Sequence, residues 1–518
     1  MSKTIVNTDK RIYWFDEDLI LREITQTIDP FYDVSVLEPV NEGQFRNLYI
    51  VTNNYRTVKN WNGEWDEVRG LSGLSDIQVA RVRTLEVNNN HLICANIAKY
   101  GSGSPDAGRG LIDEVSELID TVDTIIDVFG LTVEQGYKRF NKTIVWSNIL
   151  QPEVFTPTLD NQAGDIDIDE DGGEIVRIKK LAELNIIYKA NSIWLLIHVG
   201  LPYVFVKKFY TASVGLLAVN CIVEIANVHY FVGHDFDIYR FDGVNVANLS
   251  SPTSIKEYIK SEIDFDKIYA SHALVDIDRK EIEFVFFAKQ DITKLYDEFS
   301  VVYNYESNLF SRRDSIAKCG GYFLEGTGIT VIDDVDTIID NIDIPIDSFR
   351  SGVMIDSVLD MIDSIHDPID QYGEKGVPRR KLLIGDRHGW VYLHNYGDSF
   401  DGEDIYAYYE TGDEDYSAAS NRTLDDHTKL IRDFLLLIED QGVTLDLDLY
   451  IGTKMGMDGK LYWKGPYPYK QDGQGNGRVK LKADGNYHRF RFVSKFKGQY
   501  IRILGYVIGV DDYGRVIR

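Results

Sequence analysis

Short segments in which apolar and polar residues alternate recur along most of the chain, each bounded by turn residues. Alternation with a period of two indicates strands with one buried face. Residues 46–65 predict a strand, a turn and a strand, with Asn62-Gly63 as a hairpin signal, and residues 173–199 predict three short strands. The same pattern returns in residues 83–97, 219–246, 267–289, 298–314 and 379–400. It predicts an all-β-dominated fold of repeated antiparallel hairpins.

The predicted hairpins share an apolar first strand, a turn rich in Gly, Asn or Asp, and an aromatic-rich second strand. Such repetition is typical of a β-propeller, which protects its strand edges by closing a ring. We therefore expect an N-terminal arm and first strands at 1–45 and a β-propeller-like domain at 46–400. Residues 401–518 predict a β-rich region that completes the ring or forms a small sandwich on it. A stacked β-sandwich is the structural alternative for the whole.

Two segments have helical instead of strand spacing. Apolar residues recur every three or four positions in 111–130 and in 331–349, with acidic residues between them. The six residues "VDTIID" occur in both segments. We therefore predict two helical insertions, at about 101–142 and 322–376. Their one-sided apolar stripes pack either on the same subunit or on a neighbouring one.

The charge balance excludes one class of function. The 518 residues include 55 basic and 82 acidic ones, which gives a net charge of −27. A surface this acidic repels phosphate groups. Sequence-specific binding of DNA or RNA is therefore not expected. A channel through which DNA passes without binding remains compatible with this charge.

The cysteines and the apolar runs predict neither a metal knuckle nor a membrane protein. Cys94, Cys221 and Cys319 lie far apart and never form C-x-x-C, so we interpret them as small buried hydrophobic residues. No stretch approaches the roughly 20 apolar residues of a membrane span, and the N-terminus lacks the apolar run of a signal peptide. We expect a protein that matures in a reducing cytoplasm, without a membrane span.

The stretch 164–174 begins like a calcium-binding loop. Asp167, Asp169 and Asp171 alternate ahead of Gly172, as in the D-x-D-x-D-G pattern. The twelfth position of such a loop requires a glutamate, and here it is Ile178. An EF-hand is thereby excluded, and we predict an acidic turn at a strand edge. Whether a surface cation lies near the three aspartates stays open at this point.

A second acidic segment, "HYFVGHDFD", brings two histidines close to two aspartates. His229 and His234 lie near Asp235 and Asp237, a combination that suits metal binding or acid–base chemistry. The flanking strand pattern favours turn roles for Gly233 and Asp235 instead. No nucleophile-elbow, zinc-protease or phosphate-loop motif occurs. Abundant carboxylates leave a glycosidase pair open, but we expect no catalytic residues, no cofactor and no metal ligands.

Several motifs occur in order along the chain, in residues 143–157, 161–196, 230–250, 273–286 and 301–314, and more weakly in 485–492 and 501–508. Taken in this order, they resemble the tail nozzle or tail hub proteins of short-tailed bacteriophages. The chain departs from the family pattern in its two acidic insertions and in Phe310, where the family has tryptophan. The resemblance implies a propeller-like subunit of a ring, often a hexamer, below the portal and adaptor, with a lumen for DNA ejection and no shared catalytic residues.

The resulting expectation is a structural virion protein and not an enzyme. Its expected partners are other copies of itself in a ring, hexameric by preference, the adaptor and portal-proximal proteins, tail fibre proteins, and genomic DNA that slides through without sequence-specific binding. We expect assembly in the host bacterial cytoplasm and a final location in the virion tail. Ring stoichiometry, exact neighbours and host are left open by the sequence.

Two other classes of function are retained. One is a carbohydrate-binding (receptor-binding) or glycan-cleaving propeller protein of a tail, to which Tyr462, Trp463, Tyr467 and Tyr469 would offer stacking surfaces. Packing of a strand edge and loop is the plainer interpretation of these four aromatic residues. The other class is a non-viral cytoplasmic propeller scaffold, which needs only the generic hairpin pattern.

Overall fold

The chain forms an all-β-dominated structure of many antiparallel sheets in two compact units, Met1–His394 and Asn395–Arg518. We describe each unit by itself. The computed structural model describes residues 5–7, 11–15, 21–25, 40–54, 56–100, 133–134, 137–171, 173–251, 253–289, 298–315, 317, 319–325, 379–385, 391–394, 406–417, 427–438, 445–471, 477–494 and 503–515. The predicted helices at 111–130 and 331–349 lie outside these residues.

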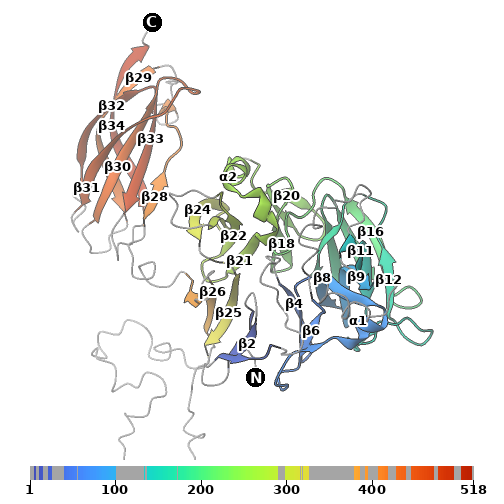
Figure 1. Ribbon diagram of the computed structural model, residues 1–518. Helices are drawn as coiled ribbons and strands as arrows, with labels where there is room; N and C mark the ends of the chain where they lie inside the picture. Colours follow the sequence, from blue (N-terminus) through green and yellow to red (C-terminus); the bar gives the residue numbers. More distant parts are fainter. Residues whose placement is uncertain are drawn as a thin grey trace, which may run out of the picture. The chain divides into compact units, whose positions relative to one another are not determined.

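The first unit begins with three sheets whose strands follow one another along the chain (Figure 1). The first contains β1 (Ile5–Asn7), β2 (Ile12–Phe15) and β3 (Leu21–Glu23). The second contains β4 (Asn41–Phe45), β5 (Leu48–Thr52), β6 (Lys59–Trp61) and β7 (Arg69–Gly70), and the short helix α1 (Ser72–Asp76) follows it. The third contains β8 (Val79–Asn88), β9 (His91–Tyr100), β10 (Val133–Glu134), β11 (Tyr137–Trp146) and β12 (Gly164–Asp167).

Three four-stranded antiparallel sheets come next, each with its strands in chain order, followed by a three-stranded one. Between the second and third lie α2 (Ile255–Glu262) and a 3₁₀ helix (Phe265–Ala270). The strands are β13 (Ile175–Leu181), β14 (Leu184–Lys189), β15 (Ile193–His198) and β16 (Phe205–Thr211); β17 (Ile222–Ile225), β18 (Val228–Val232), β19 (Ile238–Phe241) and β20 (Val246–Asn248); β21 (His272–Asp276), β22 (Glu281–Phe287), β23 (Glu298–Asn304) and β24 (Leu309–Ser315); and β25 (Cys319–Glu325), β26 (Arg379–Gly385) and β27 (Val391–Leu393).

The first strands of successive sheets lie next to one another. Strand β8 contacts both β4 and β13, and β21 contacts both β17 and β25. Between β13 and β17, the guanidinium of Arg177 donates to the carbonyl of Val219 over 3.1 Å. Asn220, just before β17, forms a parallel bridge with His272 at the start of β21. Its side-chain amide also donates over 3.1 Å to the carbonyl of Val40, just before β4.

Apolar residues fill the spaces between consecutive sheets. One buried cluster includes Phe231 of β18 and Phe284 of β22, and another joins Trp146 of β11 to Trp194 of β15. A smaller cluster joins Leu274 of β21 to Ile384 of β26. Strands that are buried on both faces explain the near-continuous apolar runs of this unit.

The second unit is a two-sheet sandwich with its own core (Figure 1). Its sheets have the orders β28-β33-β30-β31 and β32-β29-β34. Phe434 of β29 and Phe490 of β33 are both fully buried and lie 5.2 Å apart between ring centroids, so the sheets share one apolar interior. The strands are β28 (Ala407–Glu410), β29 (His427–Ile438), β30 (Leu445–Lys454), β31 (Tyr462–Gln471), β32 (Val479–Gly485), β33 (Tyr487–Ser494) and β34 (Ile503–Arg515).

The three strands predicted in 173–199 are confirmed as β13, β14 and β15. The Asn62-Gly63 signal follows β6 instead of joining two strands in a two-residue hairpin. The Asn62 side chain accepts hydrogen bonds from the backbone N–H groups of Glu64 and Trp65, at 2.9 and 3.0 Å. This side-chain turn opens a longer connection to β7, and Gly63 takes the left-handed conformation that the turn needs, with φ of 86°.

Candidate functional site

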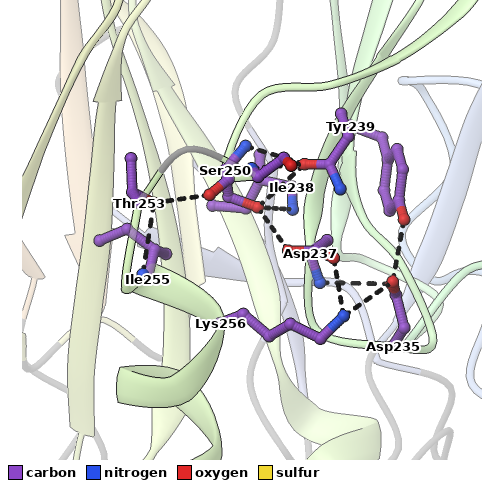
Figure 2. A network of polar contacts seen from close by, with 10 residues as sticks. Asp235, Asp237, Ile238, Tyr239, Ser250, Thr253, Ile255 and Lys256 are labelled. Atoms are coloured by element: carbon purple, nitrogen blue, oxygen red, sulfur yellow. Dashed lines mark hydrogen bonds and ion pairs between the residues drawn. The ribbon is translucent and has the colours of Figure 1, made fainter.

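The turn between β18 and β19 carries two carboxylates that a lysine of α2 bridges (Figure 2). The N–H of Gly233 donates to the carbonyl of Asp237 over 2.8 Å, which closes the turn. Lys256, in the first turn of α2, donates to Oδ2 of Asp237 at 2.7 Å and to Oδ2 of Asp235 at 3.2 Å. The side chain of Asp237 is only 10% exposed. Two segments separated along the chain are thereby tied together by charge.

Two hydroxyl groups complete the network. Tyr239 donates to Oδ2 of Asp235 at 2.9 Å, and Ser250 donates to Oδ1 of Asp237 at 2.8 Å. Burial opposes the ionisation of Asp235, but hydrogen bonds from Tyr239 and Lys256 outweigh it and lower the pKa of this carboxyl. The hydrogen bond to Asp237 raises the pKa of Lys256. Burial and the hydrogen bond to Asp235 raise the pKa of Tyr239. The carboxylate of Asp235 and the ammonium of Lys256 are therefore charged near pH 7.

All four carboxylate oxygens of this network accept a hydrogen bond. Oδ1 of Asp235 accepts from the backbone N–H of Asp237 at 3.3 Å, and the other three oxygens are bonded to Lys256, Tyr239 or Ser250. A carboxylate that binds a metal ion or transfers a proton needs an oxygen atom that can reach the ion or the substrate. The arrangement instead holds the β18–β19 turn against the start of α2, in agreement with the predicted turn role of Asp235.

The two histidines of this segment do not join the aspartates. His229 is fully buried, and its Nε2 lies 2.8 Å from the carbonyl of Lys180, so that Nε2 carries the proton. Its Nδ1 lies 2.9 Å from the hydroxyl of Tyr188. Burial lowers the pKa of His229 to about 3, which keeps the ring neutral near pH 7. His234 accepts through Nδ1 from the N–H of Gly215 at 3.1 Å.

The three aspartates of the calcium-like stretch have separate partners. Asp167 accepts a hydrogen bond from Thr143, and Asp169, which is 73% exposed, lies 3.9 Å from the ammonium of Lys142. Asp171 is bonded to Lys189. The carboxylates therefore do not converge on one point, and the described residues contain no group of three or more acidic, histidine or cysteine side chains that could hold a metal ion.

Sequence reasoning missed the buried ion pair that Asp171 makes. The ammonium of Lys189 is fully buried, and it contacts Asp171 and the carbonyl of Ile168, the latter at 2.9 Å. The same carboxylate accepts from Ser192 and from the indole N–H of Trp194, at 3.0 Å for the indole. Burial opposes ionisation of Asp171, but these hydrogen bonds outweigh it and lower its pKa. The sequence signal for this pair is a lysine at the end of an apolar strand, β14.

A second buried carboxylate, also missed from sequence, lies in β22. Glu283 is 4% exposed, its carboxylate lies 3.0 Å from Nε2 of His394, and Arg313 of β24 donates to it at 3.4 Å. Arg313 also donates to Glu281 at 3.2 Å. Burial opposes ionisation of Glu283, but the hydrogen bond from His394 and the charge of Arg313 outweigh it and lower its pKa to about 2.

The depressed pKa of Glu283 predicts an acid-sensitive contribution to stability. Because the folded-state pKa is about 2 and the unfolded value is near 4.5, the contribution is complete above pH 4.5 and disappears as the pH falls through 2. It amounts to about 3 kcal/mol near neutral pH. We expect urea unfolding between pH 7 and pH 2 to show a steeper loss of stability for the wild type than for Glu283→Gln. Parallel curves would contradict this, and Glu281→Gln is the matched control.

The four aromatic residues considered for sugar stacking do not form one platform. Tyr469 is fully buried, and its hydroxyl accepts from the N–H of Leu436 at 3.0 Å, whereas Tyr462 is 61% exposed. Trp463 pairs with Gly452 in the sheet and lies under the guanidinium of Arg491, with 4.2 Å from Cζ to the ring centroid. Tyr467 packs against the sandwich core. Strand alternation sends these rings to both faces of the sheet.

Two of the cysteines fit the predicted role. Cys94 and Cys221 are buried and unpaired, and burial raises the pKa of both thiols. Cys319 lies in β25. No helix in the described ranges is both long and apolar enough to cross a membrane.

Comparison with known proteins does not assign the chain to a family. No protein-family model matches the chain, and no curated protein matches it. Among solved structures, the computationally designed Ika8 protein matches with a TM-score of 0.29 and 10% identity, over 61% of this chain and 85% of that one. An exo-β-1,3-galactanase from Phanerochaete chrysosporium matches with a TM-score of 0.25 and 9% identity, over 98% of this chain and 100% of that one. Likeness at this level carries no argument about function.

Proposed function

We propose that the chain is a structural subunit of a bacteriophage tail. In this proposal, copies of the chain form a nozzle or hub ring, a hexamer by preference, that continues the DNA-ejection conduit below the portal and adaptor. Tail fibre proteins are its further neighbours. The role is mechanical and not enzymatic. The ordered motifs that resemble the tail nozzle family motivate the proposal, and their position in the fold supports it.

The observation that carries the proposal is that two family-like motifs pair with each other in one sheet. Residues 273–286 contribute most of β21 and β22, and residues 301–314 contribute most of β23 and β24. Arg313 donates to Glu281 across the sheet, and Asn304 donates to the carbonyl of Arg279 at 3.2 Å. Phe310, which replaces the family's tryptophan, packs on Tyr303 at 4.9 Å between ring centroids. Pairing and packing of the motif residues within one sheet support a scaffold role.

A β-propeller is the finer architecture that we propose for residues 46–400, together with β4, which pairs with β5. The contacts between the first strands of successive sheets support it, because the blades of a propeller place their innermost strands around one axis. The bonds from Asn220 to Val40 and from Arg177 to Val219 join segments that begin different blades. The parallel bridge between Asn220 and His272 fits neighbouring inner strands that run in the same direction.

The net charge supports a conduit that DNA slides through. If the −27 charge extends into the lumen of the ring, phosphates are repelled and the DNA does not adhere. A lumen lined by lysine and arginine would overturn this part of the proposal while leaving the ring itself intact. The lining can be read directly from a map of the assembled ring.

The oligomeric state is the test of the proposed function. The purified full-length chain is examined by negative-stain microscopy and mass photometry, alone and after mixing with the portal–adaptor complex of the phage that encodes it. We expect closed rings with a central hole in at least one of the two samples, because obligate ring interfaces bury about 2,000 Å² or more. A chain that stays monomeric and unbound in both samples would contradict the proposal.

A further inference from the structure

A cavity of about 390 Å³ lies between the N-terminal three-stranded sheet and the β6–β7 connection. This volume is within the range of about 300–1,000 Å³ that is typical of small-molecule sites. The walls combine three indole rings with four charged side chains, and none of the motifs used for the proposed function contributes to them. The lining residues are Trp14, Arg22, Glu23, Ile24, Trp61, Gly63, Glu64, Trp65 and Asp66.

The aromatic wall is held in place by its neighbours. Trp61 is 3% exposed, and its indole N–H donates to the carbonyl of Trp65 at 2.7 Å. Trp14 of β2 lies against Trp61, with ring centroids 5.8 Å apart. Arg69 covers one face of Trp65, with 4.3 Å from Cζ to the ring centroid. Trp14 and Trp65 are both partly exposed, so apolar ring surface reaches the cavity.

The polar wall offers both acceptors and a donor. The side-chain turn at Asn62 fixes the backbone of Glu64 and Trp65, so the exposed carboxylates of Glu64 and Asp66 stand next to the indole rings. The guanidinium of Arg22 lines the same cavity. Glu23 is held by Arg11 at 2.8 Å. A ligand with hydroxyl groups and apolar C–H faces can hydrogen-bond to the charged side chains and pack its C–H faces on the indole rings.

Two ligand classes fit an acidic aromatic pocket, and the ring geometry distinguishes them. A quaternary ammonium is held between several ring faces. Here the rings of Trp14 and Trp61 contact each other, so this pair does not enclose a cation, and Arg69 already lies over one face of Trp65. A pyranose needs a single ring face and hydrogen-bonding groups at its edge. The geometry points to a sugar-binding site, in which this cavity binds one pyranose unit.

The proposal goes beyond a role in a DNA conduit and does not depend on it. Saturation-transfer NMR on the full-length protein tests it with glucose, galactose, mannose, rhamnose and N-acetylglucosamine, and with tetramethylammonium as the rival probe. We expect at least one sugar to bind with a Kd on the order of mM, as is typical for so small a ligand. Trp65→Ala should weaken that binding at least about tenfold.

Two further variants keep the test decisive. Glu64→Gln changes an exposed side chain and should weaken sugar binding without unfolding the protein. Trp463→Ala is the matched control, because this ring also carries an arginine, Arg491 at 4.2 Å, but belongs to the second unit. Sugar binding that Trp65→Ala and Glu64→Gln weaken and Trp463→Ala preserves supports the site. The proposal would be overturned if none of the five sugars binds or if only tetramethylammonium binds. It would also be overturned if Trp463→Ala weakens sugar binding and Trp65→Ala does not.

Discussion

Replacing Asp171 with alanine will lower the free energy of unfolding of the first unit by about 3–5 kcal/mol, the usual effect of removing one partner of a buried ion pair. The ammonium of Lys189 has no exposed surface. Without the carboxylate, its partners in the described structure are the carbonyls of Ile168 and residue 171. Ser192 and Trp194 lose an acceptor at the same time. A buried charge is then left with dipoles alone.

Urea unfolding followed by fluorescence measures this loss, and Asp169→Ala is the matched control. Asp169 belongs to the same alternating stretch, but its side chain is 73% exposed and its ion pair spans 3.9 Å. Such a pair contributes about 0–1 kcal/mol. Equal effects of the two substitutions would contradict the assignment. Stabilisation of the wild type by Ca²⁺ that Asp167→Ala, Asp169→Ala and Asp171→Ala all abolish would restore the cation site instead.

Replacing Phe434 with alanine should destabilise the second unit by about 3–5 kcal/mol and leave the first unit unchanged. Phe434 is fully buried. Its ring centroid lies 5.2 Å from that of Phe490, 5.5 Å from Phe492 and 5.6 Å from Tyr506. These rings come from both sheets of the sandwich. The substitution removes a ring that packs against side chains of both sheets, and it leaves a cavity that the strands cannot close.

Differential scanning calorimetry separates the two units if each unfolds cooperatively by itself. We expect Phe434→Ala to move only one of two transitions to lower temperature. Leu437→Ala is the control on the same strand, because Leu437 points to the outer face and is 43% exposed. It should change the free energy of unfolding by no more than about 0.5 kcal/mol. A single transition that shifts as a whole would show that residues 395–518 are not an independent folding unit.

The sequence predicted those features that depend on neighbouring residues. The three strands between 173 and 199 follow from alternation and from the turns between them, which are local properties of the chain. The turn role of Asp235 follows from the Gly and Asp residues around it. The absence of a glutamate at position 178 excluded an EF-hand without any structure, because the loop ligands are fixed by their spacing.

The partners of the charged residues were beyond sequence reasoning. Asp171 and Lys189 lie 18 positions apart, and the pairing of β13 with β14, which sets Ile175 opposite Lys189, brings the segment of Asp171 to the lysine. Glu283 meets Arg313 because two strand pairings place β22, β23 and β24 side by side. The carboxylates are so numerous that no local pattern distinguishes these two from the exposed ones.

By itself, the sequence determined the strand-rich class of this protein, its repeated hairpins and the family resemblance that motivates a role in a tail, since alternation, turns and motif order are written along the chain. Tertiary structure alone decided which carboxylates are buried and paired with a cationic side chain. It also separated Tyr462, Trp463, Tyr467 and Tyr469 onto different faces, and it brought Trp14, Trp61 and Trp65 to one cavity. Burial and proximity between distant residues arise from strand pairing and sheet packing, and no local pattern encodes them.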